Sequence, residues 1–140
     1  MRRKCPRCSF VTDDDSITKC RRDHSVLVEA GTSVLRVAFA NGVTVEIAPG
    51  DEVRFGRDPD WSDHAEWLQE FAKVSRRHAT VGFRTGGTAW VMVESDSRNL
   101  TYVGSTPIAK GRSITLDDGC TLRFSRKLSA TVTIETGDDL

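Results

Sequence analysis

From Val34 onward the sequence is a series of short β-prone runs separated by turn residues, and this pattern leaves few fold classes open. Asn41-Gly42 joins the runs 34–40 and 43–47, and Asn-Gly is a strong hairpin signal because both turn residues adopt positive φ. Many short strands at close spacing predict an all-β sandwich or barrel of antiparallel strands. The further strands are predicted at 52–55, 78–84, 88–94, 101–103, 113–116, 120–125 and 130–136.

One stretch, residues 61–72, departs from the β pattern. Apolar residues recur there at helical spacing, and Pro59 and Asp60 suit the N-terminal end of a helix. We therefore predict one helix inserted in the β-domain, with its aromatic residues packing rather than binding a ligand. The residues that share its apolar face are Trp61, Ala65, Leu68 and Ala72.

The length and charge of the chain exclude several classes of protein. A chain of 140 residues can form one compact domain plus a small appendage. Its 20 Lys and Arg balance 20 Asp and Glu, so nucleic-acid binding through a large positive field is not expected. No apolar run approaches the roughly 18 residues of a membrane span. Because Met1-Arg-Arg-Lys4 leads into cysteines and not into an apolar segment, we expect a cytoplasmic protein without a secretory signal.

Residues 1–30 are polar, and they contain three of the four cysteines. Cys5-x2-Cys8 followed by Cys20 has the spacing of a tetrahedral zinc site, in which thiolates from two turns bind one ion. The fourth ligand is either His24, the more usual zinc ligand, or Asp23, which repeats the spacing of the first turn. We predict a structural zinc ion here, because a segment with almost no hydrophobic core needs metal coordination to be stable. The alternative is that the cysteines are reduced thiols at the surface.

The segment from Cys5 to about Val28 resembles a zinc ribbon, and we assign residues 1–30 to it and residues 31–140 to the β-domain. Basic residues near the cysteines, among them Arg21 and Arg22, make a nucleic-acid-binding ribbon with the β-sandwich as its scaffold the alternative function. The fourth cysteine, Cys120, lies in an alternating run and is expected to be a buried, unreactive residue within a strand.

Three polar motifs in the β-domain occur where loops are expected: Gly56-Arg57, Ser75-Arg-Arg-His78 and Ser97-Arg-Asn-Leu-Thr101. Their order and spacing resemble those of the forkhead-associated (FHA) domain, a β-sandwich that binds phosphothreonine. The resemblance covers about residues 33–136. It implies an FHA-like sandwich that acts as a signalling adaptor downstream of a Ser/Thr kinase, with a phosphothreonine-containing protein, such as the kinase or its substrate, as its partner.

The resemblance also implies roles for single residues. Arg57 and Ser75 would bind the phosphate, and Arg has the forked donors that suit a phosphate dianion. Arg76 would add a second cationic donor, while Asn99, flanked by Arg98, would bond the peptide backbone. Two further residues would support the site from within the protein, and they are Gly56 and His78. Arg77 is expected to point to solvent.

Leu100 stands where the family has glycine, which implies a slightly different loop or a pocket wall that changes the peptide preference. The chain contains no P-loop, dinucleotide-binding glycine pattern or nucleophile elbow, so we expect a binding module and not an enzyme. A sandwich that has lost phosphate binding is a third reading, but Arg57, Ser75 and Asn99 occurring together argue against it.

Overall fold

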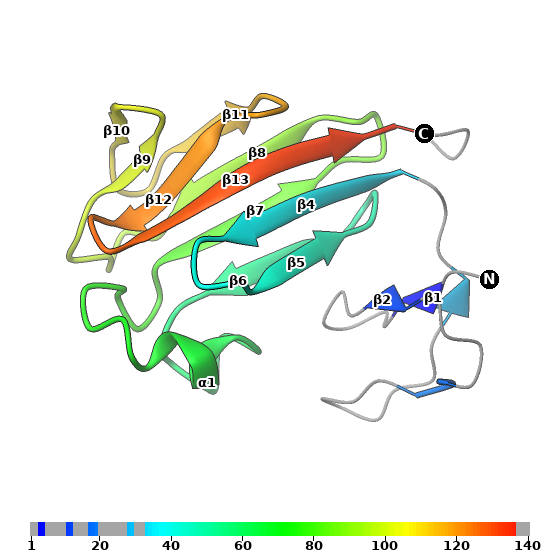
Figure 1. The fold of residues 1–140 in the computed structure, drawn as a ribbon. Coiled ribbons are helices and arrows are strands. Elements are labelled where there is room, and N and C mark those ends of the chain that lie inside the picture. Colours follow the sequence, from blue (N-terminus) through cyan, green and yellow to red (C-terminus); the bar gives the residue numbers. More distant parts are fainter. Residues whose placement is uncertain (1–2, 5–10, 13–16, 20–27, 30–32, 137–140) are drawn as a thin grey trace.

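The computed structural model describes two β-sheets packed face to face, with a short helix at one end (Figure 1). The larger sheet has the strand order β10-β9-β12-β13-β4-β5, and the smaller has the order β11-β8-β7-β6. All pairs of neighbouring strands in both sheets are antiparallel. The residues that the structure describes are 3–4, 11–12, 17–19, 28–29 and 33–136.

The strands of the larger sheet are β4 (Val34–Phe39), β5 (Thr44–Ile47), β9 (Thr101–Val103), β10 (Thr106–Ile108), β12 (Thr121–Ser125) and β13 (Leu128–Glu135). Those of the smaller sheet are β6 (Glu52–Phe55), β7 (Ala79–Phe83), β8 (Ala89–Val93) and β11 (Ser113–Leu116). The predicted all-β sandwich is confirmed. The sequence pattern missed β10, whose central Pro107 cannot donate a ladder hydrogen bond; β10 lies at a sheet edge, where proline is tolerated.

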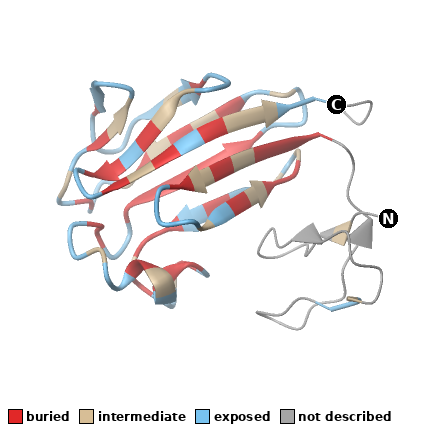
Figure 2. Ribbon diagram, viewed as in Figure 1, coloured by how far each residue is buried: buried red, intermediate tan, exposed pale blue. Residues whose placement is uncertain are grey.

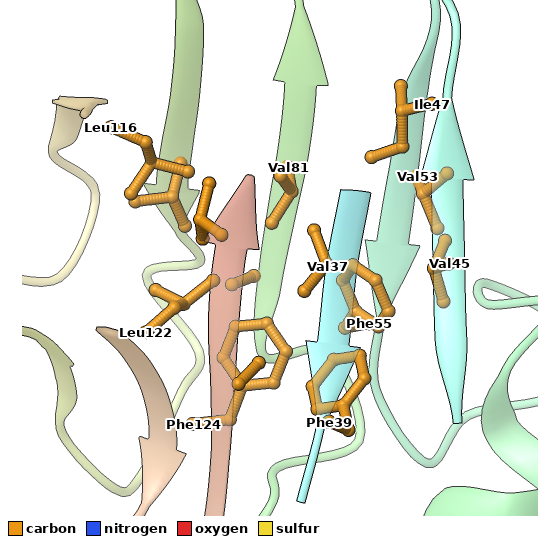
Figure 3. Packing of buried hydrophobic residues seen from close by; sticks show 14 of the residues in the cluster. Val37, Phe39, Val45, Ile47, Val53, Phe55, Val81, Leu116, Leu122 and Phe124 are labelled. Atoms are coloured by element: carbon orange, nitrogen blue, oxygen red, sulfur yellow. The ribbon is translucent and has the colours of Figure 1, made fainter. Parts of the chain in front are cut away.

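Successive side chains along a strand point to opposite faces of its sheet, so buried and exposed residues alternate along most strands (Figure 2). The buried faces meet between the two sheets and form the core. Three aromatic rings from different strands pack against one another in it (Figure 3): Phe39, Phe55 and Phe124 lie with centroids 5.1 to 5.7 Å apart. Strand β7 is buried along its whole length. This rigid interior holds the ends of β6, β7 and β9 in place, and the three polar motifs adjoin those ends.

The helical segment is shorter than predicted. Only Ala65–Leu68, helix α1, is α-helical, and turns make up the rest of residues 61–72. Ala65 and Leu68 are buried as expected, whereas Trp61 is half-buried over the Arg54 guanidinium and Ala72 is exposed. An isolated single turn has little stability of its own, so tertiary contacts set its length. The aromatic residues do pack on the core, since the Trp67 ring lies 5.0 Å from that of Phe39.

Near the N-terminus, three two-residue strands form a separate small sheet that the sequence pattern did not predict. Strand β1 (Arg3–Lys4) pairs with both β2 (Val11–Thr12) and β3 (Val28–Glu29). The predicted zinc ligands Cys5, Cys8, Cys20, and Asp23 or His24 lie outside the described residues. Within the described part of the chain no group of His, Cys, Asp or Glu could hold a metal ion, and no helix is long and apolar enough to cross a membrane.

Two leucines test how the helical segment contributes to stability. Leu68 is fully buried and Leu100 is 47% exposed. Leu68→Ala should therefore lower the free energy of unfolding by about 2–5 kcal/mol, because it leaves a cavity in the core. The same change at Leu100 should cost less than about 0.5 kcal/mol. Urea unfolding of both variants measures the difference, and equal costs would contradict the packing described here.

Candidate functional site

Gly56-Arg57 directly follows β6, and both residues are tied to the loop that contains Ser75. The Arg57 backbone N–H donates to the Ser75 carbonyl (3.2 Å), and the Arg57 Nε donates to the Val74 carbonyl (2.6 Å). A Cβ atom at position 56 would overlap the carbonyl oxygen of Arg76, so only glycine lets the two backbones approach this closely. The Nε bond leaves the terminal NH2 groups of the Arg57 guanidinium for an external partner.

His78 ties the Ser75 loop to the interior. It is fully buried, its Nδ1 accepts a hydrogen bond from the Ser75 backbone N–H (3.0 Å), and its Nε2 lies 2.9 Å from the Thr101 Oγ1. Because Nδ1 accepts, a neutral ring must carry its proton on Nε2, which then donates to Thr101. Burial lowers the pKa of His78 to about 4 and so keeps the ring neutral near neutral pH.

Two hydrogen bonds join the loop after β8 to the Ser75 loop, and a third, from Ser97 to Asn99, lies within the loop after β8. The Arg98 backbone N–H donates to the Ser75 Oγ (2.8 Å), the Ser97 Oγ donates to the Asn99 carbonyl (2.9 Å), and the Asn99 Nδ2 donates to the Lys73 carbonyl (2.8 Å). The Ser75 Oγ accepts from Arg98, and because the Ser97 hydrogen is donated to the Asn99 carbonyl, the Ser75 hydrogen is the one that points toward the Ser97 Oγ. Its nearest hydroxyl is that of Ser97, at 3.4 Å.

Asp58 holds two of the arginines in the second motif. One carboxylate oxygen lies 3.6 Å from an Arg76 guanidinium nitrogen, and the other lies 3.5 Å from the Arg77 Nε. The Arg77 side chain is exposed, as predicted, and the contact with Asp58 adds a partner that the sequence did not indicate. Asp58 is almost fully buried, whereas the Arg76 side chain is 70% exposed and presents its charge at the surface.

These loops surround a pocket of about 670 Å³. The five predicted phosphopeptide residues all line it, so the structure brings together residues spread over more than 40 positions of the chain. Five cationic and two acidic side chains line the pocket, which gives it a positive excess despite the zero net charge of the chain. The cations are Arg57, Lys73, Arg76, Arg77 and Arg98, and the acids are Asp58 and Asp96.

Several residues of the site had no predicted role. Ser97 and Thr101 belong to the third motif, so the motif itself was the signal that could have identified them. Asp58 and Lys73 flank the first two motifs without a recognisable pattern. Gln69 follows α1, and its side-chain nitrogen donates to the Arg57 carbonyl (2.6 Å); no sequence signal marks this contact.

Cys120 also differs from its prediction. It precedes β12 instead of lying within a strand, and it is only half-buried. The strand begins one residue later because the Cys120 N–H donates to the Asp117 carbonyl (3.1 Å) in the preceding turn. Burial raises the pKa of the Cys120 thiol and so disfavours the nucleophilic thiolate.

The family model of the FHA domain matches residues 53–125, which is more than half of the chain and includes all three motifs. The chain belongs to the FHA domain family. Its fold is also that of solved FHA domains. The FHA domain of an Arabidopsis thaliana hypothetical protein has a TM-score of 0.64 and 21% identity, over 81% of this chain and 99% of that one.

Two further FHA domains agree with this assignment. That of CT664 from Chlamydia trachomatis has a TM-score of 0.61 and 17% identity, over 76% of this chain and all of that one. The N-terminal FHA domain of S. cerevisiae Rad53p, solved in complex with a phosphothreonine peptide, has a TM-score of 0.58 and 18% identity, over 73% and 94%. A comparison with curated protein sequences finds no match.

The burial of neutral His78 predicts a specific loss of stability in acid. In the unfolded chain the histidine pKa is about 6.5, against about 4 in the folded FHA domain. As pH falls between these values the unfolded state binds the proton first, so the free energy of unfolding should fall by about 3 kcal/mol. Above pH 6.5 both states are neutral and this contribution is constant.

His78→Asn isolates this effect, since asparagine can still accept from the Ser75 N–H but does not titrate. Urea unfolding of both proteins from pH 7 to pH 4 should show the wild type losing about 3 kcal/mol more than the variant. The carboxylates and other histidines are common to both chains and cancel in the difference. Parallel stability curves would show that His78 does not carry this effect.

Proposed function

We propose that this chain is a phosphothreonine-peptide binding module, and not an enzyme, that acts as a signalling adaptor downstream of a Ser/Thr protein kinase. Its partner would be a phosphothreonine-containing protein, such as the kinase or one of its substrates. The proposal draws support from solved relatives: the FHA domain of Rad53p is described in complex with a phosphothreonine peptide, and that of MEK1 in complex with the HOP1 pThr318 peptide.

The observation that carries the proposal is the preorganised pair of donors formed by Arg57 and Ser75. The Arg57 guanidinium is oriented by the Val74 carbonyl before any ligand arrives, and the Ser75 hydroxyl accepts from the Arg98 N–H. Its own hydrogen makes only the long 3.4 Å contact with the Ser97 Oγ, which a phosphate oxygen would replace. A phosphate dianion would accept from both groups in charge-assisted bonds at little cost in side-chain entropy. Arg76, at the mouth of the pocket, would add charge.

Asn99 and Arg98 would bind the peptide beside the phosphate. The Asn99 amide is oriented by its bond to the Lys73 carbonyl, and its oxygen would then accept from a backbone N–H of an extended peptide. The exposed Arg98 side chain lines the same pocket and would approach the peptide from the neighbouring loop. Gly56 and His78 would act indirectly, by holding the Arg57 and Ser75 loops together.

Arg57→Ala should abolish phosphate-dependent binding. Calorimetric titration with a degenerate phosphothreonine peptide library, with phosphoserine and unphosphorylated versions beside it, measures this loss. Arg57→Lys keeps the charge but loses the fork, so it should also bind more weakly than the wild type, by about tenfold or more. Arg54→Ala, which removes an exposed arginine from the preceding strand, is the matched control and should bind as the wild type does.

Failure of the folded wild type to bind any phosphothreonine peptide would refute the proposal. Loss of nucleic-acid binding on charge reversal at Arg21 and Arg22, with no phosphopeptide binding, would support the alternative of a nucleic-acid-binding ribbon. We do not favour that alternative, because the net charge is zero and the matched family covers the β-domain.

We also propose a structural zinc site at Cys5, Cys8, Cys20 and either His24 or Asp23. Sequence spacing supports it, and the pairing of β1 with β2 adds that residues 3–4 and 11–12, on either side of Cys5 and Cys8, lie side by side. The purified protein should contain one zinc ion per chain by elemental analysis, and Cys20→Ser should lose it. Cys120→Ser is the matched control and should retain zinc; a metal-free wild type would refute the site.

A further inference from the structure

A groove extends from the candidate phosphate pocket along the end of the larger sheet. It consists of two hollows of about 420 and 350 Å³, which share Tyr102 and Arg126. The first hollow also shares Lys73, Arg98 and Asn99 with the phosphate pocket, so the three spaces lie next to one another. We call the two hollows together the basic groove, and its lining residues of interest are Lys73, Arg98, Leu100, Tyr102, Arg123, Arg126 and Lys127.

The charges of the basic groove are all of one sign. Five Lys and Arg side chains line it and no Asp or Glu does, in contrast to the phosphate pocket, which contains two acids. None of the five makes an ion pair with a carboxylate in the part of the chain that the structure describes. Arg36, on the same sheet, pairs with both Glu46 and Glu135. Although the chain has zero net charge, its described part thus gathers cations without carboxylate partners beside the phosphate pocket.

The basic groove also offers apolar contact. Leu100 is the one large hydrophobic side chain that is exposed among the described residues, and it lines the hollow nearer the phosphate pocket. Tyr102 on β9 stands opposite Arg123 on β12 in the sheet register, so a ring and a guanidinium lie on adjacent strands. A groove with both apolar and cationic side chains suits an acidic peptide, because the apolar side chains can pack on the peptide while the cations attract its acidic groups.

We propose that the basic groove is a second anion-binding subsite, which takes acidic or additionally phosphorylated residues of the same peptide that places its phosphothreonine in the pocket. The inference rests on the proposed function and deepens it. Arg123, Arg126 and Lys127 bind the second anionic group, and Leu100 and Tyr102 pack on the peptide between the two sites. The preferred partner is therefore a phosphothreonine flanked by acidic or phosphorylated residues, and not an isolated phosphothreonine.

Titration of the full chain with a matched peptide series tests this subsite. Every peptide contains one phosphothreonine; its flanks are neutral, or bear two Asp residues, or bear one further phosphothreonine, on the N-terminal or the C-terminal side. The wild type should bind one acidic or doubly phosphorylated series about tenfold more tightly than the neutral peptide, and added salt should reduce the gain. Comparison of the Asp and phosphate arms distinguishes the two sources of charge.

The variant Arg126→Ala/Lys127→Ala should lose this gain and still bind the neutral peptide as the wild type does. The matched control is Lys110→Ala/Arg112→Ala, which removes the same charge from exposed positions that line neither the pocket nor the groove. It should retain the gain.

Equal binding of neutral and acidic peptides would overturn the subsite and leave the proposed function standing. Absence of all phosphate-dependent binding would refute the proposed function and the subsite together. Equally strong binding of an unphosphorylated acidic peptide or of a DNA duplex would show a non-specific polyanion surface, which also overturns the subsite.

Discussion

The imidazole of His78 joins the second and third polar motifs of this FHA domain through hydrogen bonds that no exposed group could maintain as well. It accepts from the Ser75 backbone, donates to Thr101, and lies 3.5 Å from the Ser97 hydroxyl. Hydrogen bonds to a buried ring are protected from competition with water, and an unpaired partner would carry a desolvation cost. In the described part of the chain no buried side-chain nitrogen or oxygen lacks a partner. The hydrogen bonds that hold the site thus continue from the buried interior to the surface loops.

The rigidity of the sandwich explains why the loops need no ligand to be ordered relative to one another. Phe124 packs on Phe39, Phe55 and the His78 ring, so the aromatic core directly supports the imidazole. The inserted segment adds support from the other side, because Leu68 is buried in the core while Gln69 binds the Arg57 carbonyl. A binding site that is already organised loses less entropy when the ligand binds.

Charge placement separates the face that contains the site from the rest of the domain. Carboxylates neutralise arginines elsewhere, as Glu46 and Glu135 do for Arg36, and Asp58 holds Arg76 and Arg77 at the pocket. Among the residues that the structure describes, the cations of the basic groove have no such partners. Overall composition averages these regions to zero, so net charge correctly excluded a uniformly basic protein and could not reveal a local basic surface.

Local signals in the sequence were enough to predict the all-β class and most strand positions, because period-two alternation and turns such as Asn41-Gly42 act over a few residues. The five residues that line the pocket came from the resemblance of the three ordered motifs to the FHA family. The sequence did not determine the length of helix α1, since a single turn depends on tertiary contacts such as those of Leu68 with the core. Strand β10 was not predicted, because its central Pro107 is untypical of strands and is tolerated only where the strand lies at a sheet edge. The pairing of Arg77 with Asp58, the Gln69 contact and the union of Leu100, Tyr102 and Arg126 in one groove were decided only by the tertiary structure. These contacts join residues 12 to 26 positions apart in the sequence. Such residues meet because of the way the strands and loops pack together, and no local sequence pattern indicates the contact.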